Sequence, residues 1–391
     1  MKYRLFIIAV LFVFVMFCAS LVFESGLFSN SGRPGAGCIL LSKNAPGNSE
    51  QQNESSGSYQ VASDPSPRLG VQNSDDQSVF LGASYPAEED PDTGFRFQVK
   101  INSLGASVEQ IIFSNGGGKG FSDCDEDNPR PLTIIDSAGQ DTMSLASRGL
   151  VFENYGQKIP LDRLHWKGLG VDISPDGSQT ARFEALIRDL DTDRELFRLT
   201  KSYTVIPGSY MMTGSIKLEN LSDLRYKISF DMNGPVGIPR EGLRSDMRSA
   251  MAGYRTADET VAAKRVSVKD LRKNGWGSST SIETPGSKCL WVSAANKYFA
   301  AIMVPAPFEG RSEVTWIKNK YARFYNPDKD PKADSGDETL GVGIHTRPEN
   351  FGQLGRPSSS RIYDFSLYVG PKDKAFFDSK EEYRRLGFVQ V

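Results

Sequence analysis

Alternation of apolar and polar residues is the pattern that most restricts how this chain can fold. In FRFQVKI, residues 95–101, every second residue is apolar and the residues between them are Arg, Gln and Lys. A β-strand places successive side chains on opposite faces, so such a stretch predicts a half-buried strand. The same alternation recurs in Phe197/Leu199/Tyr203/Val205, Tyr210/Met212/Ile216/Leu218, Tyr226/Ile228/Phe230 and Tyr363/Phe365/Leu367/Val369.

Turn-forming residues separate these stretches, as in IPGS (206–209) and ENLSD (219–223). Long helical patterns are nearly absent before the last twenty or so residues. The sequence therefore predicts an all-β fold of large antiparallel sheets packed face to face, followed by a short helix. A body of about 300 residues can bury roughly three quarters of its surface, so it needs no disulfide. Cys124 and Cys289 either pair or stay reduced, and the sequence leaves both open.

The amino end has a different character. Leu5 to Phe23 is an uncharged run of 19 residues, the length that crosses about 30 Å of hydrocarbon as a helix. Fourteen of them are Leu, Ile, Val or Phe, which gives an insertion free energy of roughly 4 to 8 kcal/mol in favour of the membrane. Residues 1–24 are thus predicted to be a transmembrane anchor, with membrane-embedded residues Leu5, Ile8, Leu11, Phe14, Phe17 and Phe23.

A cleaved signal peptide is the alternative for this segment, because Lys2 and Arg4 precede it and the small residues 18–20 lie within it. The apolar run is longer than a usual signal-peptide core of about 7 to 15 residues, and no A-x-A site follows, which favours an uncleaved anchor. The basic residues ahead of the span predict a cytoplasmic amino end and an extracytoplasmic remainder. Residues 25–77, rich in Ser, Asn, Gln, Gly and Pro, predict a disordered linker to a β domain over residues 78–372 and a helix over 373–391.

Signs of bond chemistry are weak. SNGGGKGF (114–121) lacks the first glycine and the final Ser or Thr of a phosphate-binding loop, and DLDTDRE (189–195) lacks the glycine of a calcium loop, so both are interpreted as turns. The two histidines, His165 and His345, are expected to be structural. No catalytic residue, cofactor or metal ligand is predicted, and the net charge of -2 argues against a nucleic-acid partner.

One segment is strongly basic. Residues 240–273 hold nine Lys or Arg against five Asp or Glu. They are predicted to form either a solvated excursion from the sheets or a surface that faces anionic headgroups or a partner. In the second case Arg244 and Arg248 are candidate contact residues.

The tail predicts a strand, a stop and a helix. The stop is GPK (370–372), because proline has no N–H for sheet pairing. Ser379 and Glu382 fit a capping box, with Asp378 as a competing cap, so a helix is expected to begin there. Its buried face would hold Tyr383, Leu386 and Val389, and Glu381 could pair with Arg385.

In order of features the chain resembles the amino-terminal half of the YidC-type membrane protein insertases. The resemblance rests on the apolar anchor, the polar linker, LGASVEQIIF, NKYFAAIMVP and YVGPKD…YRRLGF. Its motif residues are Asn296, Tyr298, Phe299, Pro305, Gly370, Pro371 and Lys372. The resemblance implies a periplasmic β-supersandwich similar to galactose mutarotases, in a single-pass protein of the bacterial inner membrane.

The same resemblance implies a function without bond chemistry, namely assistance to the insertion and folding of membrane proteins. Contacts with Sec translocase components and with nascent membrane proteins are expected, and Lys372, Arg384 and Arg385 are candidate contact residues. The family's five-helix core would begin after Val391, so a separately encoded core is expected as a further partner. The alternative is a membrane-anchored carbohydrate-binding or mutarotase-like domain, which gains support if either histidine lies in a pocket within about 4 Å of a carboxylate.

Overall fold

The structure is a computed structural model that describes residues 67–84, 94–114, 121–122, 130–137, 142–241, 246–273, 279–283, 288–325 and 338–391. All of them belong to one compact unit, residues 63–391. The predicted anchor and most of the predicted linker lie outside the described residues, as do Cys124 and Arg244. No helix among the described residues has the length and apolarity that a membrane crossing requires.

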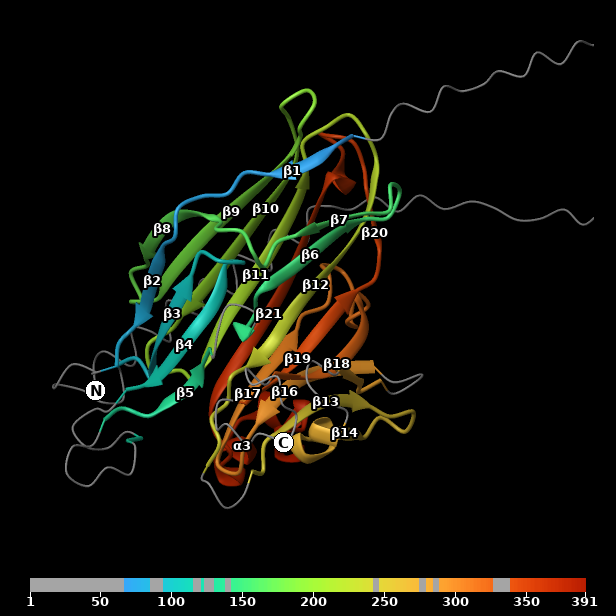
Figure 1. Cartoon of the computed structure of the whole chain (residues 1–391). Helices are drawn as coiled ribbons and strands as arrows, with labels where there is room; N and C mark the ends of the chain where they lie inside the picture. The colour runs from blue at the N-terminus through green and yellow to red at the C-terminus, as the bar shows by residue number, and fades with distance from the viewer. Residues whose placement is uncertain are drawn as a thin grey trace, which may run out of the picture. The chain divides into compact units, whose positions relative to one another are not determined.

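Antiparallel strands make up most of this unit, and the few helices are short (Figure 1). The largest sheet has ten strands in the order β1 (Leu69–Val71), β9 (Gln179–Asp189), β10 (Arg194–Val205), β11 (Met211–Asn220), β21 (Ser360–Pro371), β17 (Phe299–Pro305), β16 (Lys288–Ala295), β13 (Ser249–Arg255) and β14 (Val261–Ser267), with β8 (Lys167–Ile173) paired to β9.

The second sheet has seven strands. Their order is β15 (Ser279–Ser281), β18 (Ile317–Tyr325), β19 (Thr339–Thr346), β12 (Tyr226–Val236), β6 (Ser147–Phe152) and β7 (Gln157–Pro160), with β20 (Glu349–Phe351) paired to β12. A third sheet has the order β2 (Ser78–Gly82), β3 (Phe97–Asn102), β4 (Ser107–Phe113) and β5 (Thr133–Asp136).

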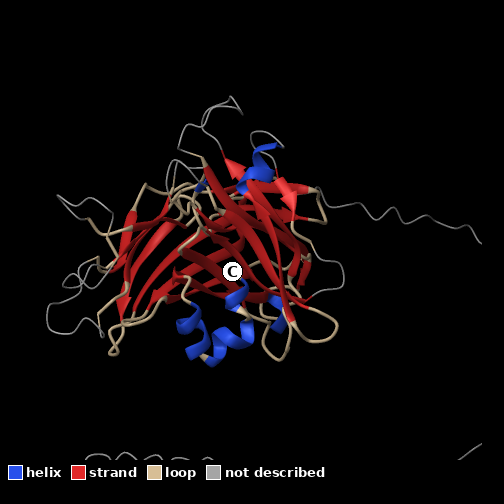
Figure 2. Ribbon diagram, turned by 90° about the horizontal axis from the view of Figure 1, so that it is seen from below, coloured by secondary structure: helices blue, strands red, loops and turns tan. Residues whose placement is uncertain are grey.

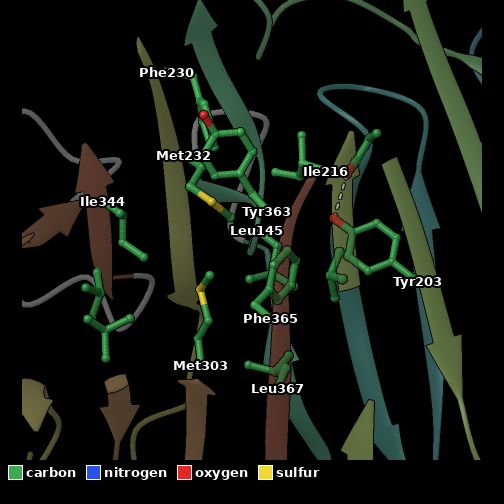
Figure 3. Close-up of a cluster of buried hydrophobic side chains, with 14 of the residues drawn as sticks. Leu145, Tyr203, Ile216, Phe230, Met232, Met303, Ile344, Tyr363, Phe365 and Leu367 are labelled. Carbon is green, nitrogen blue, oxygen red and sulfur yellow. Dashed lines mark hydrogen bonds between the residues drawn. The ribbon is translucent and has the colours of Figure 1, made fainter. Parts of the chain in front are cut away.

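The predicted alternation positions the core. In β10 the apolar residues Phe197, Leu199, Tyr203 and Val205 are all buried. The two larger sheets share one apolar core, in which Phe230 of β12 meets Tyr363 of β21 edge to face with 4.9 Å between ring centroids (Figure 3). Such aromatic pairs add about 0.5 to 1.5 kcal/mol beyond the area they bury.

The predicted turns that the structure describes are confirmed, whereas residues 115–120 of SNGGGKGF lie outside the described residues. Residues 206–209 join β10 to β11 in a hairpin with Val205 opposite Met212. Residues 219–223 instead carry the chain from β11 in the first sheet to β12 in the second. DLDTDRE is the turn between β9 and β10, where the Asp189 carboxylate accepts hydrogen bonds from the Asp191 N–H and the Thr192 hydroxyl.

Two expectations about segment boundaries need correction. Residues 69–71, inside the stretch expected to be a linker, form β1 and pair with Asp189 to Ile187 of β9. The basic segment 240–273 is not a solvated excursion, because it supplies β13, β14 and α2 (Val268–Lys273). Alternation alone could not reveal β13, since all five residues 249–253 are buried.

Arg248, expected to be a surface contact residue, is 3% exposed. Its guanidinium lies 2.8 Å from the Asp246 carboxylate and donates to the Glu338 carbonyl at 2.5 Å. Arg272 of α2 completes the network through Asp246 and Glu338. Burial alone would raise the pKa of Asp246, but the hydrogen bonds and charge of Arg248 hold it below its ordinary value. The Arg248 guanidinium is thus paired with a buried carboxylate inside the fold.

The tail forms two short helices rather than one. They are α3 (Lys374–Ser379) and α4 (Glu381–Leu386), followed by the 3₁₀ turn η4 (Phe388–Gln390). The capping box was wrong: Asp373 caps α3, and Ser379 ends that helix. Gly387 closes α4 in the left-handed conformation with φ 65°. The break in helical periodicity buries Phe388 and leaves Val389 44% exposed, contrary to the expected face.

Candidate functional site at the carboxy-terminal junction

The two segments with the strongest resemblance, NKYF and GPK, meet in the fold although more than seventy residues separate them. Phe299 of β17 is paired with Pro371 of β21. The Lys372 N–H donates to the Tyr298 carbonyl at 2.7 Å, and the Lys372 ammonium donates to the Asn296 carbonyl at 3.0 Å. We call this meeting point, residues 296–299 with 370–373, the junction.

Asn296 organises the junction. It is 5% exposed, and its side-chain carbonyl accepts from the N–H groups of Tyr298 (2.9 Å) and Phe299 (2.8 Å). Its amide donates to the Pro239 carbonyl at 3.1 Å. An Asn side chain suits such a turn because it both accepts from the backbone two or three residues on and donates elsewhere. Asn296 thus has a structural reason to be in the motif.

Lys372 was expected to contact a partner or the membrane. Its ammonium instead turns inward to Asn296. Burial, followed by the nearby Arg265, lowers the pKa of this ammonium. Lys372 is partly buried, and its ammonium helps to hold the junction together.

Gly370 and Tyr368 explain the rest of the GPK motif. A Cβ on Gly370 would lie 2.5 Å from the Tyr368 hydroxyl, so only glycine leaves room for that ring. The hydroxyl donates to the Pro371 carbonyl at 2.7 Å. Tyr368 is fully buried, and its ring packs against Phe377 (5.4 Å) and Tyr383 (5.5 Å) of the tail helices.

The tail helices therefore lie on the outer face of the ten-stranded sheet, close to the junction (Figure 2). The Trp291 indole N–H donates to the Leu386 carbonyl at 2.7 Å, and Tyr383 stacks on Phe388 with 5.0 Å between centroids. Asp373 accepts from the N–H groups of residues 375 and 376. Sequence reasoning missed Trp291, and it gave no role to Tyr368 and Phe388, which lie in the quoted segments YVGPKD and YRRLGF. Asp373, just before the helical residues 374–379, could have been recognised as a helix cap.

Two grooves border the tail helices. One, of about 500 Å³, has Leu290, Val304 and Pro305 among its lining residues, together with Glu382 and Arg385 of α4. The other, of about 630 Å³, lies between the β10–β11 turn and the tail helices. It is lined by Arg96, residues 207–211, Phe376 and residues 380–383. Pro305, a motif residue at the end of β17, thus contributes to a groove.

Arg384 and Arg385 are exposed at the surface of α4. The expected ion pair between Glu381 and Arg385 is absent, and neither guanidinium forms an ion pair with any residue that the structure describes. Both side chains are thus exposed, and Arg385 also lines the smaller groove. Tyr298 is also exposed, at 54%, with the Lys297 ammonium 4.8 Å from its ring centroid.

Both histidines have a carboxylate neighbour. His165 lies 3.6 Å from Asp76 and hydrogen-bonds the Ser103 hydroxyl at 2.8 Å. His345 of β19 contacts the Asp231 carboxylate of β12. Both histidines therefore lie as close to a carboxylate as the carbohydrate alternative requires. Neither of them lies in one of the two grooves at the tail helices.

Cys289 lies in the wall of the smaller groove as a free thiol. Burial raises the pKa of this thiol to about 11, so it is protonated and unreactive at neutral pH. Within the part of the chain that is described, no group of three or more His, Cys, Asp or Glu side chains could hold a metal ion.

Residues 95–385 match the family model of the YidC periplasmic domain. The chain belongs to this family. A curated relative, the membrane protein insertase YidC of Treponema denticola, is 26% identical over 142 residues. That match covers 36% of this chain and 23% of the relative, so the chain spans about a quarter of the YidC protein that it matches.

Solved structures match this chain at lower identity. A putative aldose 1-epimerase from Escherichia coli K12 is 12% identical with a TM-score of 0.40, over 75% of this chain and 100% of that chain. A galactose mutarotase-like protein from Lactobacillus casei is 9% identical with a TM-score of 0.41, over 75% and 100%.

Proposed function

We propose that this chain is the anchored periplasmic part of a YidC-type insertase that assists the insertion and folding of membrane proteins. In this proposal residues 1–24 span the bacterial inner membrane once, with the amino end in the cytoplasm. The periplasmic domain then acts through contacts with Sec translocase components and nascent membrane proteins, without bond chemistry.

The observation that carries this proposal is the family match across residues 95–385, which includes both segments of the junction. The geometry of the tail gives the match a physical meaning. Tyr368 and Trp291 fix the tail helices to the sheet, so Arg384 and Arg385 are presented from a rigid support. A rigid support lowers the entropy lost when a partner binds those charges.

Site-specific photocrosslinking in native membranes tests the proposal. A photoreactive residue at position 385 of the full chain is expected to capture translocase subunits or nascent membrane proteins. The same residue at position 173 is the matched control, because Ile173 of β8 is 71% exposed but lies on the opposite edge strand of the same sheet from the tail region. Equal capture from both positions, or none from position 385, would contradict the proposed contact.

A carbohydrate-directed role is the second candidate, favoured by the contact between His345 and Asp231. A His–Asp pair can exchange a proton at a sugar hydroxyl or ring oxygen. Polarimetry with galactose and the full chain would detect mutarotation above the rate in buffer. If His345→Gln leaves that excess rate unchanged, or no excess exists, this candidate fails.

A further inference from the structure

Side chains of Arg, Tyr and His gather on the face of the seven-stranded sheet that points away from the core. We call Arg148, Tyr321, Arg323, Tyr325 and His345 the Arg–Tyr cluster. They come from β6, β18 and β19, which belong to one sheet (Figure 1). The residues that alternate with them, Ala322, Phe324 and Ile344, are buried in the core, which places the cluster on the outer face.

Two guanidinium groups converge on one hydroxyl within this cluster. Arg148 donates to the Tyr325 hydroxyl at 3.3 Å, and Arg323 donates to the same oxygen at 3.5 Å. Arg323 also donates to the Tyr321 hydroxyl at 2.7 Å, but it forms no ion pair with any described residue. Asp162, 3.6 Å from Arg148, is the carboxylate that is paired with the cluster's arginines among the described residues.

The same protein shows how two close arginines are ordinarily neutralised. Arg248 and Arg272 share the Asp246 carboxylate, at 2.8 Å and 3.1 Å, and Glu338 adds a second negative charge. The Arg–Tyr cluster has a neutral phenol where that network has a bridging carboxylate. Two positive charges that are held close together without a bridging anion repel one another. The Arg–Tyr cluster therefore carries an excess of positive charge.

The Tyr321 phenol does not supply the missing charge. Burial, and then the Asp231 carboxylate, raise the pKa of Tyr321 far above its ordinary value, so its hydroxyl stays neutral. Asp231 is itself engaged by His345 and by the Lys158 ammonium at 3.1 Å. The positive charge of Arg323 therefore lacks a counter-charge from these neighbours.

The Arg323 side chain is held in one orientation by its neighbours. The Arg323 guanidinium stacks over the Tyr321 ring, with 4.4 Å to the centroid. Tyr321 has room to lie there because its partner on β19 is Gly343, where a Cβ would overlap the ring. Stacking and two hydrogen bonds orient the planar fork of Arg323, which reduces the entropy lost when it binds an oxyanion.

We propose that the Arg–Tyr cluster binds an oxyanion, either a carboxylate or a phosphate group, between Arg148 and Arg323. Both guanidinium groups donate to the ligand oxygens, and the Tyr321 hydroxyl adds a neutral donor. Because Arg323 is stacked on the Tyr321 ring, this aromatic face is covered. A sugar would need an uncovered aromatic face to stack on, so the cluster favours an anion. This site goes beyond the proposed insertase role and does not depend on it.

Isothermal titration of the full chain in detergent, with inorganic phosphate and separately with citrate, tests the site. Saturable binding of at least one probe is expected, weakening as salt is raised. Arg323→Gln is expected to lower the affinity about tenfold or more, because a charged hydrogen-bonding group is lost. Arg182→Gln, on the ten-stranded sheet and already paired with Asp172, is the matched control and is expected to bind like the wild type.

Two further measurements keep the result interpretable. Arg323→Lys keeps the charge but loses the planar fork, so intermediate affinity is expected. Without ligand, Arg323→Gln is expected to melt at the wild-type temperature or above it, because repulsion between the arginines is relieved. Binding of phosphate alone or of citrate alone identifies the ligand class. The absence of saturable binding, or an affinity that Arg323→Gln leaves unchanged in a folded protein, overturns the proposal.

Discussion

The Trp291 indole N–H donates a hydrogen bond to the Leu386 carbonyl, 95 residues further along the chain, at 2.7 Å. Both partners are buried, in a cluster that also contains Tyr368, Phe377 and Phe388. This bond joins the last helical turn of α4 to β16. It helps to explain how two helices of six residues each, too short to be stable alone, hold a defined place on the sheet.

Trp291→Phe is therefore expected to loosen the tail. The substitution leaves the Leu386 carbonyl without its partner in a buried position, at a cost of about 1 to 3 kcal/mol. Urea unfolding measures the loss, and hydrogen exchange is expected to accelerate in residues 381–391. Trp166→Phe is the matched control, because the Trp166 indole N–H is buried without a partner among the described residues. A larger loss in the control than in Trp291→Phe would contradict this account.

Asn296 offers a test of the junction. Asn296→Ala removes both the acceptor for residues 298 and 299 and the donor to Pro239, so a loss of about 2 to 3 kcal/mol is expected. Asn296→Asp keeps the acceptor and loses the donor, so it should cost less. Denaturant unfolding of the three proteins provides the comparison. Equal losses in both variants would show that the Asn296 acceptor does not organise the turn.

Two arginines that were both predicted to be contact residues, Arg248 and Arg385, are expected to behave in opposite ways. Arg248→Gln leaves Asp246 and Glu338 buried with less compensation, and should destabilise the domain by about 3 to 5 kcal/mol. Arg385→Gln removes an exposed charge without an ion pair among the described residues, and should change stability by less than about 0.5 kcal/mol. Thermal unfolding at neutral pH measures both. If Arg385→Gln destabilises as much as Arg248→Gln, the assignment of Arg385 to a contact role fails.

The Asp246 network also predicts a pH dependence. The pKa of this carboxyl is lower in the folded protein than in the unfolded chain. Its contribution is therefore present above the unfolded pKa of about 3.9 and is lost as the pH falls through the lower folded value. Asp246→Asn should reduce the acid sensitivity of the domain, which urea titrations between pH 5 and 3 can measure.

Lys201 predicts the opposite slope. It occupies an inward position of β10, fully buried, and its Nζ donates to the Leu145 carbonyl and to the Ser147 hydroxyl. Burial lowers the pKa of Lys201 well below its ordinary value. Between that lowered value and about 10.4 the unfolded chain binds more protons, so stability rises with pH in this window.

Urea unfolding at pH 7, 8 and 9 would measure this slope against Lys201→Met, which has no such titration. The wild type is expected to gain stability relative to the variant as the pH rises. A difference that is constant across the three pH values would show that Lys201 keeps its ordinary pKa in the fold.

The alternation of apolar and polar residues correctly predicted which side chains are buried wherever one face of a strand meets the core and the other meets water. Phe197, Leu199 and Tyr203 are buried as their alternation predicts. The same rule fails for Lys201, which takes a core position because two groups of another strand region accept its hydrogen bonds. It also fails for β13, where both faces are covered and alternation disappears.

The tail shows a second limit. Helical spacing predicted that Val389 would be buried with Tyr383 and Leu386, but Gly387 adopts a left-handed conformation and rotates the following residues. Asp373, and not Ser379, caps the first helix, because the chain turns immediately after β21. The sequence contains both signals, Gly387 and Asp373. Asp378 and Ser379, however, were equally acceptable helix caps when only neighbouring residues were considered.

The amino-acid sequence by itself determined the strands with an alternating pattern, most of their inward faces, the hairpin turn at residues 206–209 and the motifs of the family. These follow from forces that act between near neighbours along the chain. Only the tertiary structure decided that NKYF and GPK form one junction, that Arg248 is buried, and that Arg148 and Arg323 share one hydroxyl. The physical reason is that the environment of a charge depends on its spatial neighbours, and Glu338, the partner of Arg248, lies 90 residues away in the chain.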